Sequence, residues 1–155
     1  MGAVSGNTDF TTEGILDTTT TLGGAEAGAF DQAITKPDPA MVMMSLATYQ
    51  SIDPNNPAVF SSTIIDGHIR NALKYTGVVI SDSMSAEALS SYDVSQLGVK
   101  LVEAGGDMSC IGQTDYVKPI VDGLNERAKS DPAFASKVTA AATRVMALKI
   151  KMGLA

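Results

Sequence analysis

The segment Tyr75–Met84 limits the possible folds more than any other part of this sequence. Within it, the apolar run Val78–Ile80 leads directly to the carboxylate of Asp82. So short an apolar run, set between a glycine and small polar residues, is typical of a strand buried on both faces of a parallel sheet. We therefore predict a buried parallel strand with Asp82 just past its carboxyl end, where the loops of α/β sheets and barrels bind ligands.

Two interpretations of Asp82 follow from its position alone. An aspartate after a strand often forms an Asx turn or caps the following helix, and here Ser83–Ser85 leads to a helical pattern at Ala86–Leu89. The same carboxylate could instead act in catalysis, since strand ends hold functional groups rigidly. The spacing of the residues does not decide between the two.

Helical patterns alternate with two further apolar strands. We predict strands at 40–46 and 107–111 and helices at 25–34, 61–73, 94–104, 116–129 and 134–152, with Asp131 as the last N-cap and Pro132 at the first helical position. Alternating helices and strands predict right-handed parallel β/α units. Residues 2–24 are rich in glycine, threonine and asparagine, so we expect a loop-rich arm there.

Composition and charge exclude several classes of function. The formal charge of −6 over 155 residues disfavours nucleic acid as a partner. No stretch resembles a membrane span, and the amino terminus lacks the features of a signal peptide, so we expect a soluble, cytoplasmic protein as the chain stands. Glycine pairs without a phosphate-binding pattern, and no cluster with ligand spacing, predict no cofactor and no metal.

Two single residues receive a structural interpretation. Cys110 is the only cysteine, which rules out a disulfide within the chain, and we expect it to be a small buried hydrophobe. His68 is the only histidine. It falls inside the helix that precedes the central strand, so we expect a partly exposed helix residue and neither a ligand nor a base.

Four segments together suggest a family. The segments Met41–Leu46, Ile52–Ser62, Tyr75–Met84 and Ala104–Asp107 resemble, in order and spacing, the later strands of glycoside hydrolase family 3. The likeness is greatest to its β-N-acetylhexosaminidase-like members from actinobacteria, and it covers nearly the whole chain.

The resemblance implies a fold and an activity. The family's catalytic domain is a (β/α)8 barrel, which typically takes about 250 residues. We therefore expect a partial TIM barrel, a half-barrel of about three to four parallel β/α units with flanking helices. In this assignment residues 25–155 correspond to strands six to eight, and residues 1–24 form the arm. The implied activity is the retaining hydrolysis of O-glycosides of the β-N-acetylhexosaminide type. The resemblance also implies that full-length relatives can be exported.

The resemblance also assigns roles to single residues. Asp82 stands at the position of the family's nucleophile. Hexosaminidase-like members carry an Asp-x-His pair on a flexible loop as the acid/base; here Asp9 takes the place of the aspartate, and Thr11 replaces the histidine. Threonine cannot deliver a proton near neutral pH, so Asp9 or Glu13 would have to act instead.

Further family positions hold Ser83, Ser45 and Met84. Ser83 replaces a second acidic residue that many relatives carry. Ser45 matches a position near the sugar, and Met84 could contact substrate, but a strand-end serine often binds only backbone and a methionine often only fills the core.

The departures from the family leave a second function open. The sugar-binding Lys-His-Phe-Pro-Gly segment of the family has no counterpart here. The chain could therefore be an inactive half-barrel scaffold that self-associates, most simply as a dimer, or pairs with the missing half, because open sheet edges need a partner.

Overall fold

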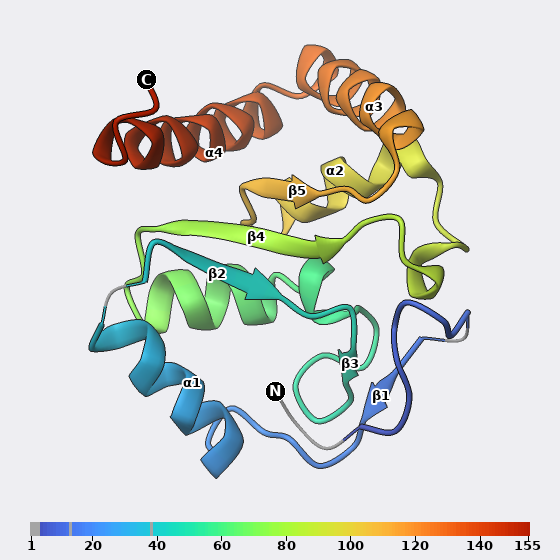
Figure 1. The fold of residues 1–155 in the computed structure, drawn as a ribbon, viewed down its shortest axis with the longest axis vertical. Coiled ribbons are helices and arrows are strands. Elements are labelled where there is room, and N and C mark those ends of the chain that lie inside the picture. The colour runs from blue at the N-terminus through green and yellow to red at the C-terminus, as the bar shows by residue number, and fades with distance from the viewer. Residues whose placement is uncertain (1–3, 13, 38) are drawn as a thin grey trace.

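The computed structural model describes residues 4–12, 14–37 and 39–155. Its centre is a sheet of three parallel strands in the order β2–β4–β5, formed by Met41–Met44, Val78–Ser83 and Met108–Cys110 (Figure 1). Consecutive strands of this sheet are joined through helical segments. The structure thus confirms the predicted α/β class and the parallel β/α units of a partial barrel.

The helices begin and end close to the predicted residues. They are α1 (Ala25–Thr35), α2 (Val94–Glu103), α3 (Val117–Ser130) and α4 (Pro132–Lys151). The predicted cap of α4 is confirmed: the Asp131 carboxylate accepts the main-chain N–H groups of Ala133 and Phe134 at 2.9 and 3.1 Å, and Pro132 takes the first helical position. Gly153, with φ of +71°, lies just beyond the end of this helix.

The helix between β2 and β4 is wider than predicted. Residues Thr63–Ala72 form a π-helix, in which the N–H of Gly67 bonds the carbonyl of Ser62 at 2.9 Å. Its expected apolar stripe is present, since Ile64, Ile65 and Ile69 are buried. Figure 1 shows this helix beneath β2 and β4, and a short 3-10 turn, Ala58–Phe60, precedes it.

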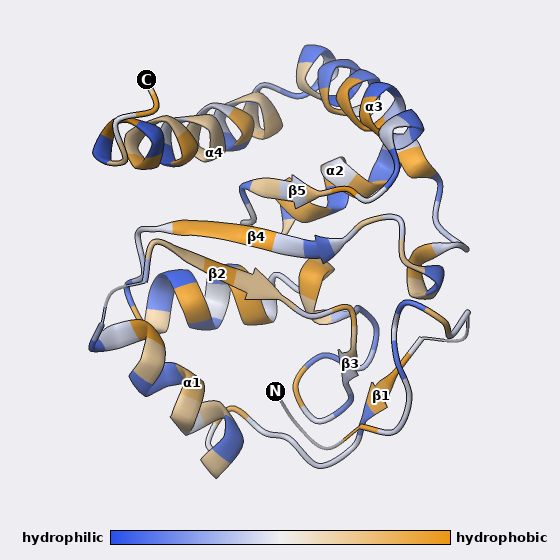
Figure 2. Cartoon of the chain, viewed as in Figure 1, coloured by the Kyte–Doolittle hydropathy of each residue, from blue (hydrophilic) through white to orange (hydrophobic). Residues whose placement is uncertain are grey.

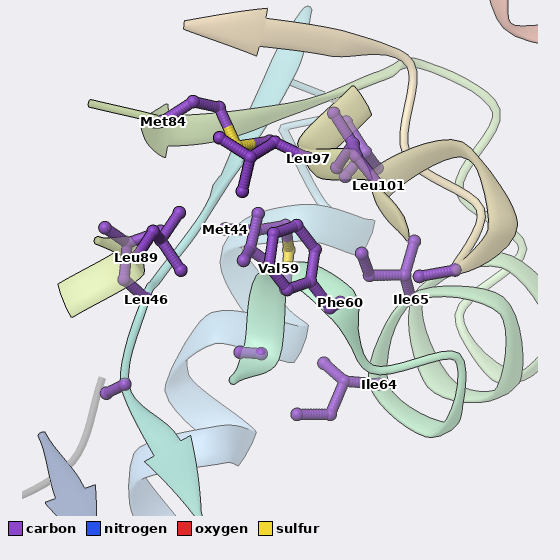
Figure 3. Packing of buried hydrophobic residues seen from close by; sticks show 14 of the residues in the cluster. Met44, Leu46, Val59, Phe60, Ile64, Ile65, Met84, Leu89, Leu97 and Leu101 are labelled. Atoms are coloured by element: carbon purple, nitrogen blue, oxygen red, sulfur yellow. The ribbon is translucent and has the colours of Figure 1, made fainter. Parts of the chain in front are cut away.

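One contiguous core lies between the sheet and the helices. Figure 3 shows Met44, Val59 and Leu97 converging there from a strand, a 3-10 turn and a helix. A second, smaller cluster joins α2 to α4 through Val99, Val102 and Phe134. Within the described part of the chain, no helix combines the length and apolar character that a membrane crossing requires.

The prediction that strand 40–46 is buried was wrong on one face. Met41 and Met43 are 45% and 61% exposed, whereas Met44 is buried. The reason is that β2 is an edge strand, and the described residues leave the side that carries Met41 and Met43 largely uncovered. Cys110 is also exposed, contrary to expectation, because it ends the other edge strand, β5.

The loop-rich first residues contain structure that was not predicted. Leu16–Asp17 (β1) pairs in parallel with Thr48–Tyr49 (β3), two residues on each strand. The Asp17 carboxylate is fully buried and accepts the main-chain N–H of Thr20 at 2.7 Å and its hydroxyl at 2.7 Å. The end of the predicted arm therefore packs on the body of the domain.

Candidate active site

Asp82 lies near the carboxyl end of β4, the central strand of the sheet. Figure 2 shows β4 changing from apolar to polar toward its arrowhead. Asp82 occupies the last but one position of the strand, and not a position after the strand as predicted. Because the neighbouring strands run in the same direction, their carboxyl ends also meet at this edge.

The Asp82 side chain is half-buried and makes a short local hydrogen bond. Its Oδ1 accepts the main-chain N–H of Ser83 at 2.7 Å. A carboxylate that is held by a main-chain donor, and that remains partly accessible, can accept a proton or attack an electrophile. This bond joins neighbouring residues, so it is not the Asx turn of the first interpretation, in which the carboxylate accepts an N–H two residues further on. It leaves a nucleophilic role open.

Two serines that follow Asp82 in the sequence connect this region to the neighbouring loop. The hydroxyls of Ser83 and Ser85 lie 3.1 Å apart, and the hydroxyl of Ser85 accepts the N–H of Gly112 at 3.1 Å. This contact links the residues after β4 to the loop after β5. Sequence analysis noted Ser83 only as a replacement of an acidic residue; no periodic signal indicated its contacts.

The loop that carries Asp9 reaches the same end of the sheet. The carbonyl of Thr8 accepts the N–H of Ala88, which lies five residues after the last strand residue of β4, at 3.0 Å. Asp9 itself is exposed, and its N–H binds the side chain of Asn7 at 2.9 Å. Thr11 is half-buried. Glu13, the alternative acid/base residue, lies outside the described residues.

Ser45 follows β2 directly and is half-buried. Its hydroxyl accepts the N–H of Ala47 at 3.0 Å and also interacts with the phenol of Tyr49. Burial raises the pKa of Tyr49, and the hydrogen bond to Ser45 lowers it by less, so the phenol is protonated at neutral pH. Sequence analysis did not identify Tyr49, because a tyrosine after a strand has no distinctive pattern.

Met84 differs from the other predicted site residues. Its side chain is fully buried and belongs to the core cluster shown in Figure 3. A contact with substrate is therefore not available to this side chain in the structure, and its role here is packing.

His68 lies inside the helix that precedes the central strand, as predicted. Its Nε2 lies 2.8 Å from the Oδ1 of Asp31 on α1, and the side chain is 16% exposed. The pair joins α1 to the π-helix. Among the described residues, His, Cys, Asp and Glu side chains form no group of three that could hold a metal ion.

A charged cluster occupies the opposite end of the sheet. The Asp107 carboxylate is fully buried and contacts the guanidinium groups of Arg70 and Arg144 as well as the N–H of Val79. Burial lowers the pKa of Arg70, and the negative charge of Asp107 opposes that shift. At the amino-terminal end of the strands, such a cluster is typical of stability and not of catalysis.

Parallel strands and a carboxylate near the end of the central strand are features of the β/α-barrel class of domains. In that class, ligands bind and react at this edge of the sheet. Residues 2–148 match the Glycosyl hydrolase family 3 N terminal domain. The chain therefore belongs to glycoside hydrolase family 3, as the sequence resemblance implied.

Known structures agree with this assignment. A β-N-acetylhexosaminidase from Beutenbergia cavernae is 36% identical, with a TM-score of 0.86 over 94% of this chain and 43% of that one. A family 3 β-N-acetylglucosaminidase from Paenibacillus is 26% identical, with a TM-score of 0.79 over 90% of this chain and 27% of that one.

A curated relative matches a shorter stretch. A protein from Arthroderma benhamiae, described as an uncharacterized secreted glycosyl hydrolase, is 36% identical over 69 residues, which are 44% of this chain and 20% of that protein. The chain thus spans less than half the length of each of these relatives.

Proposed function

We propose that this chain contributes the nucleophile Asp82 to the retaining hydrolysis of O-glycosides of the β-N-acetylhexosaminide type. One observation carries the proposal: a half-buried carboxylate near the carboxyl end of a central parallel strand, in a member of family 3. The substrate class is supported by the names of the similar structures, a β-N-acetylhexosaminidase and a β-N-acetylglucosaminidase.

The reaction needs two steps at Asp82. Its carboxylate attacks the anomeric carbon while an acid protonates the departing oxygen, which gives a glycosyl-enzyme and a free alcohol. Water then attacks the same carbon, and its proton goes to the residue that acted as acid. This second step releases the sugar and restores Asp82.

The acid/base must lie within about 5.5 Å of the nucleophile in a retaining enzyme. Asp9 is our candidate, because the hydrogen bond between Thr8 and Ala88 brings its loop to the carboxyl end of the strands, where Asp82 lies. Its side chain is exposed, which leaves the carboxylate accessible to a bound sugar. Ser45 is a candidate sugar contact, since its half-buried hydroxyl follows the neighbouring strand β2.

The strand assignment is part of the proposal. We place β2, β4 and β5 as strands six, seven and eight of a barrel. The remaining strands, which the relatives supply from their longer chains, would complete the sugar pocket beside Asp82.

A scaffold that pairs with a second copy is the alternative function. Both β2 and β5 present an unpaired edge in the described structure, and Met41 and Met43 are exposed on β2. A parallel dimer around the barrel axis would pair both edges at once and cover these methionines. In this case Asp82 would be a remnant of an ancestral site.

Covalent trapping separates these functions. The chain is incubated with a mechanism-based donor, such as a 2-deoxy-2-fluoro glycoside, and the labelled peptide is identified by mass spectrometry. We expect one label, on Asp82, and none in Asp82→Asn. Asp122→Asn, which changes an exposed carboxylate on α3, should label as the wild type does.

Turnover of an aryl N-acetylglucosaminide provides the second measurement. Label together with turnover supports the enzyme. If a folded chain shows neither label nor turnover, the proposed activity is refuted and the scaffold function remains.

A further inference from the structure

The pairing of β4 with β5 is irregular around Asp82. Ile80 lies opposite Met108, and Ser83 lies opposite Cys110, so three steps along β4 match two steps along β5. One extra residue is therefore inserted into β4, as in a β-bulge. Bulges occur at barrel rims and beside active sites, where they redirect a side chain.

The main-chain N–H and carbonyl of Cys110 fix the two sides of this bulge. Its N–H donates to the hydroxyl of Ser81 at 2.9 Å, and its carbonyl accepts the N–H of Met84 at 2.9 Å. In a regular parallel pair that N–H would bond a main-chain carbonyl of the neighbouring strand. The Ser81 hydroxyl takes the place of this carbonyl, and only Asp82 and Ser83 lie between the two fixed points.

Ser81 has no access to solvent, whereas Asp82 is half-buried. The hydroxyl of Ser81 therefore cannot contact a substrate. The Asp82 carboxylate accepts the N–H of the next residue, Ser83, at 2.7 Å, and this donor moves with the same piece of backbone. The direction of the carboxylate thus depends on the backbone of the bulge.

We infer that Ser81 is a positioning residue for Asp82: its buried hydroxyl holds the N–H of Cys110 and so fixes the bulge that directs the carboxylate. The inference rests on the proposed role of Asp82 as nucleophile. Catalytic groups must be held within about 0.5 Å of their productive position. Loss of the Ser81 hydroxyl should therefore slow the covalent step and leave sugar binding nearly unchanged.

Three variants test this role. Ser81→Ala removes the hydroxyl, and Ser81→Thr retains one. Ser61→Ala is the matched control, because Ser61 is also fully buried and its hydroxyl also accepts a main-chain N–H, from Ile64 at 3.2 Å. For each variant we measure two quantities, at a temperature where all variants are folded. They are the rate constant of labelling at a saturating concentration of the fluorinated donor, and the donor concentration that gives half of this rate.

We expect Ser81→Ala to label between about ten and a hundred times more slowly, with a half-saturating concentration within about twofold of the wild type. Ser81→Thr should recover most of the rate, and Ser61→Ala should label as the wild type does. A folded Ser81→Ala that labels at the wild-type rate, or whose loss lies only in binding, would overturn the inference.

A second measurement does not depend on activity. The amide of Cys110 should be protected from hydrogen exchange, because its N–H donates to the buried hydroxyl of Ser81. We expect Ser81→Ala to reduce this protection, with recovery in Ser81→Thr.

The two measurements separate the two ideas. If the wild type takes no label but the Cys110 amide responds as expected, the proposed hydrolysis fails and the positioning by Ser81 stands. If the protection of the Cys110 amide is the same in Ser81→Ala and the wild type, the positioning inference fails.

Discussion

Replacement of Asp107 by asparagine should destabilise the fold strongly without involving the candidate active site. The carboxylate has no solvent exposure, and its partners Arg70 and Arg144 are only 12% and 30% exposed. Asparagine can still accept the N–H of Val79, which now bonds Asp107 at 2.8 Å, but it leaves both guanidinium charges without their counter-charge.

The magnitude follows from two independent estimates. Hydrogen bonds to charged groups are worth about 1.5–3 kcal/mol each. Asparagine loses the bond from Arg144 to Oδ1, and the bond from Arg70, which shares Oδ2 with Val79, loses its charged acceptor, so the loss is about 1.5 to 6 kcal/mol. Breaking a buried ion pair by removing one partner costs about 3–5 kcal/mol. The estimates agree, and a domain stable by about 5–15 kcal/mol would lose a large fraction of its stability.

Urea unfolding measures this loss. With a slope of about 1–3 kcal/mol per molar, the midpoint should fall by at least about 1 M while the slope stays constant. Asp122→Asn is the matched control: the same chemical change breaks an exposed pair with Lys118, where solvent screening limits the loss to less than about 1 kcal/mol. Equal midpoints for Asp107→Asn and Asp122→Asn would refute the reasoning.

Three more predictions follow. Gly123→Ala should destabilise by about 1–3 kcal/mol in thermal or urea unfolding, because its Cβ would overlap the carbonyl oxygen of Ser95. Gly28→Ala in α1, where the described residues leave a Cβ without a neighbour within 4 Å, should instead stabilise by up to about 1 kcal/mol. A neutral or stabilising Gly123→Ala would contradict the packing of α2 on α3. Burial raises the pKa of Asp53 by less than its hydrogen bonds together lower it, so its folded-state pKa lies below the ordinary value. Its stabilising contribution is therefore present above the ordinary pKa of about 4 and is lost as pH falls through the lower folded-state pKa. Asp53→Asn should therefore flatten the loss of stability in acid, and an unchanged pH profile would count against these bonds. Light scattering should find twice the chain mass of 16.0 kDa if open edges pair, and Met43→Lys should shift it toward the monomer; a wild type that is a stable monomer at all concentrations would rule out the dimer.

Local chemistry explains why much of the fold could be predicted. Asp131 and Pro132 specify the start of α4 through bonds and backbone geometry that involve only their neighbours. The apolar run before Asp82 specifies β4, since a strand buried on both faces leaves a continuous hydrophobic pattern. These features need no knowledge of distant segments.

Non-local contacts account for the features that sequence analysis missed. The pairing of β1 with β3 brings together residues about thirty positions apart, over strands too short to show a periodicity. The exposure of Met43 and Cys110 depends on which strands lie at the edges of the sheet. Strand order is a property of the assembled sheet and leaves no mark on a single segment.

The amino-acid sequence by itself determined the α-helices, the strands of the central sheet and the family, and through the family it indicated Asp82. The tertiary structure alone decided how that side chain is held, because the bulge at Asp82 exists only where β4 meets Cys110 of β5, almost thirty residues further along the chain. A hydrogen bond between distant segments forms only after both have been placed by the packing of the core, so Ser81 looks like any other strand serine until the chain is folded.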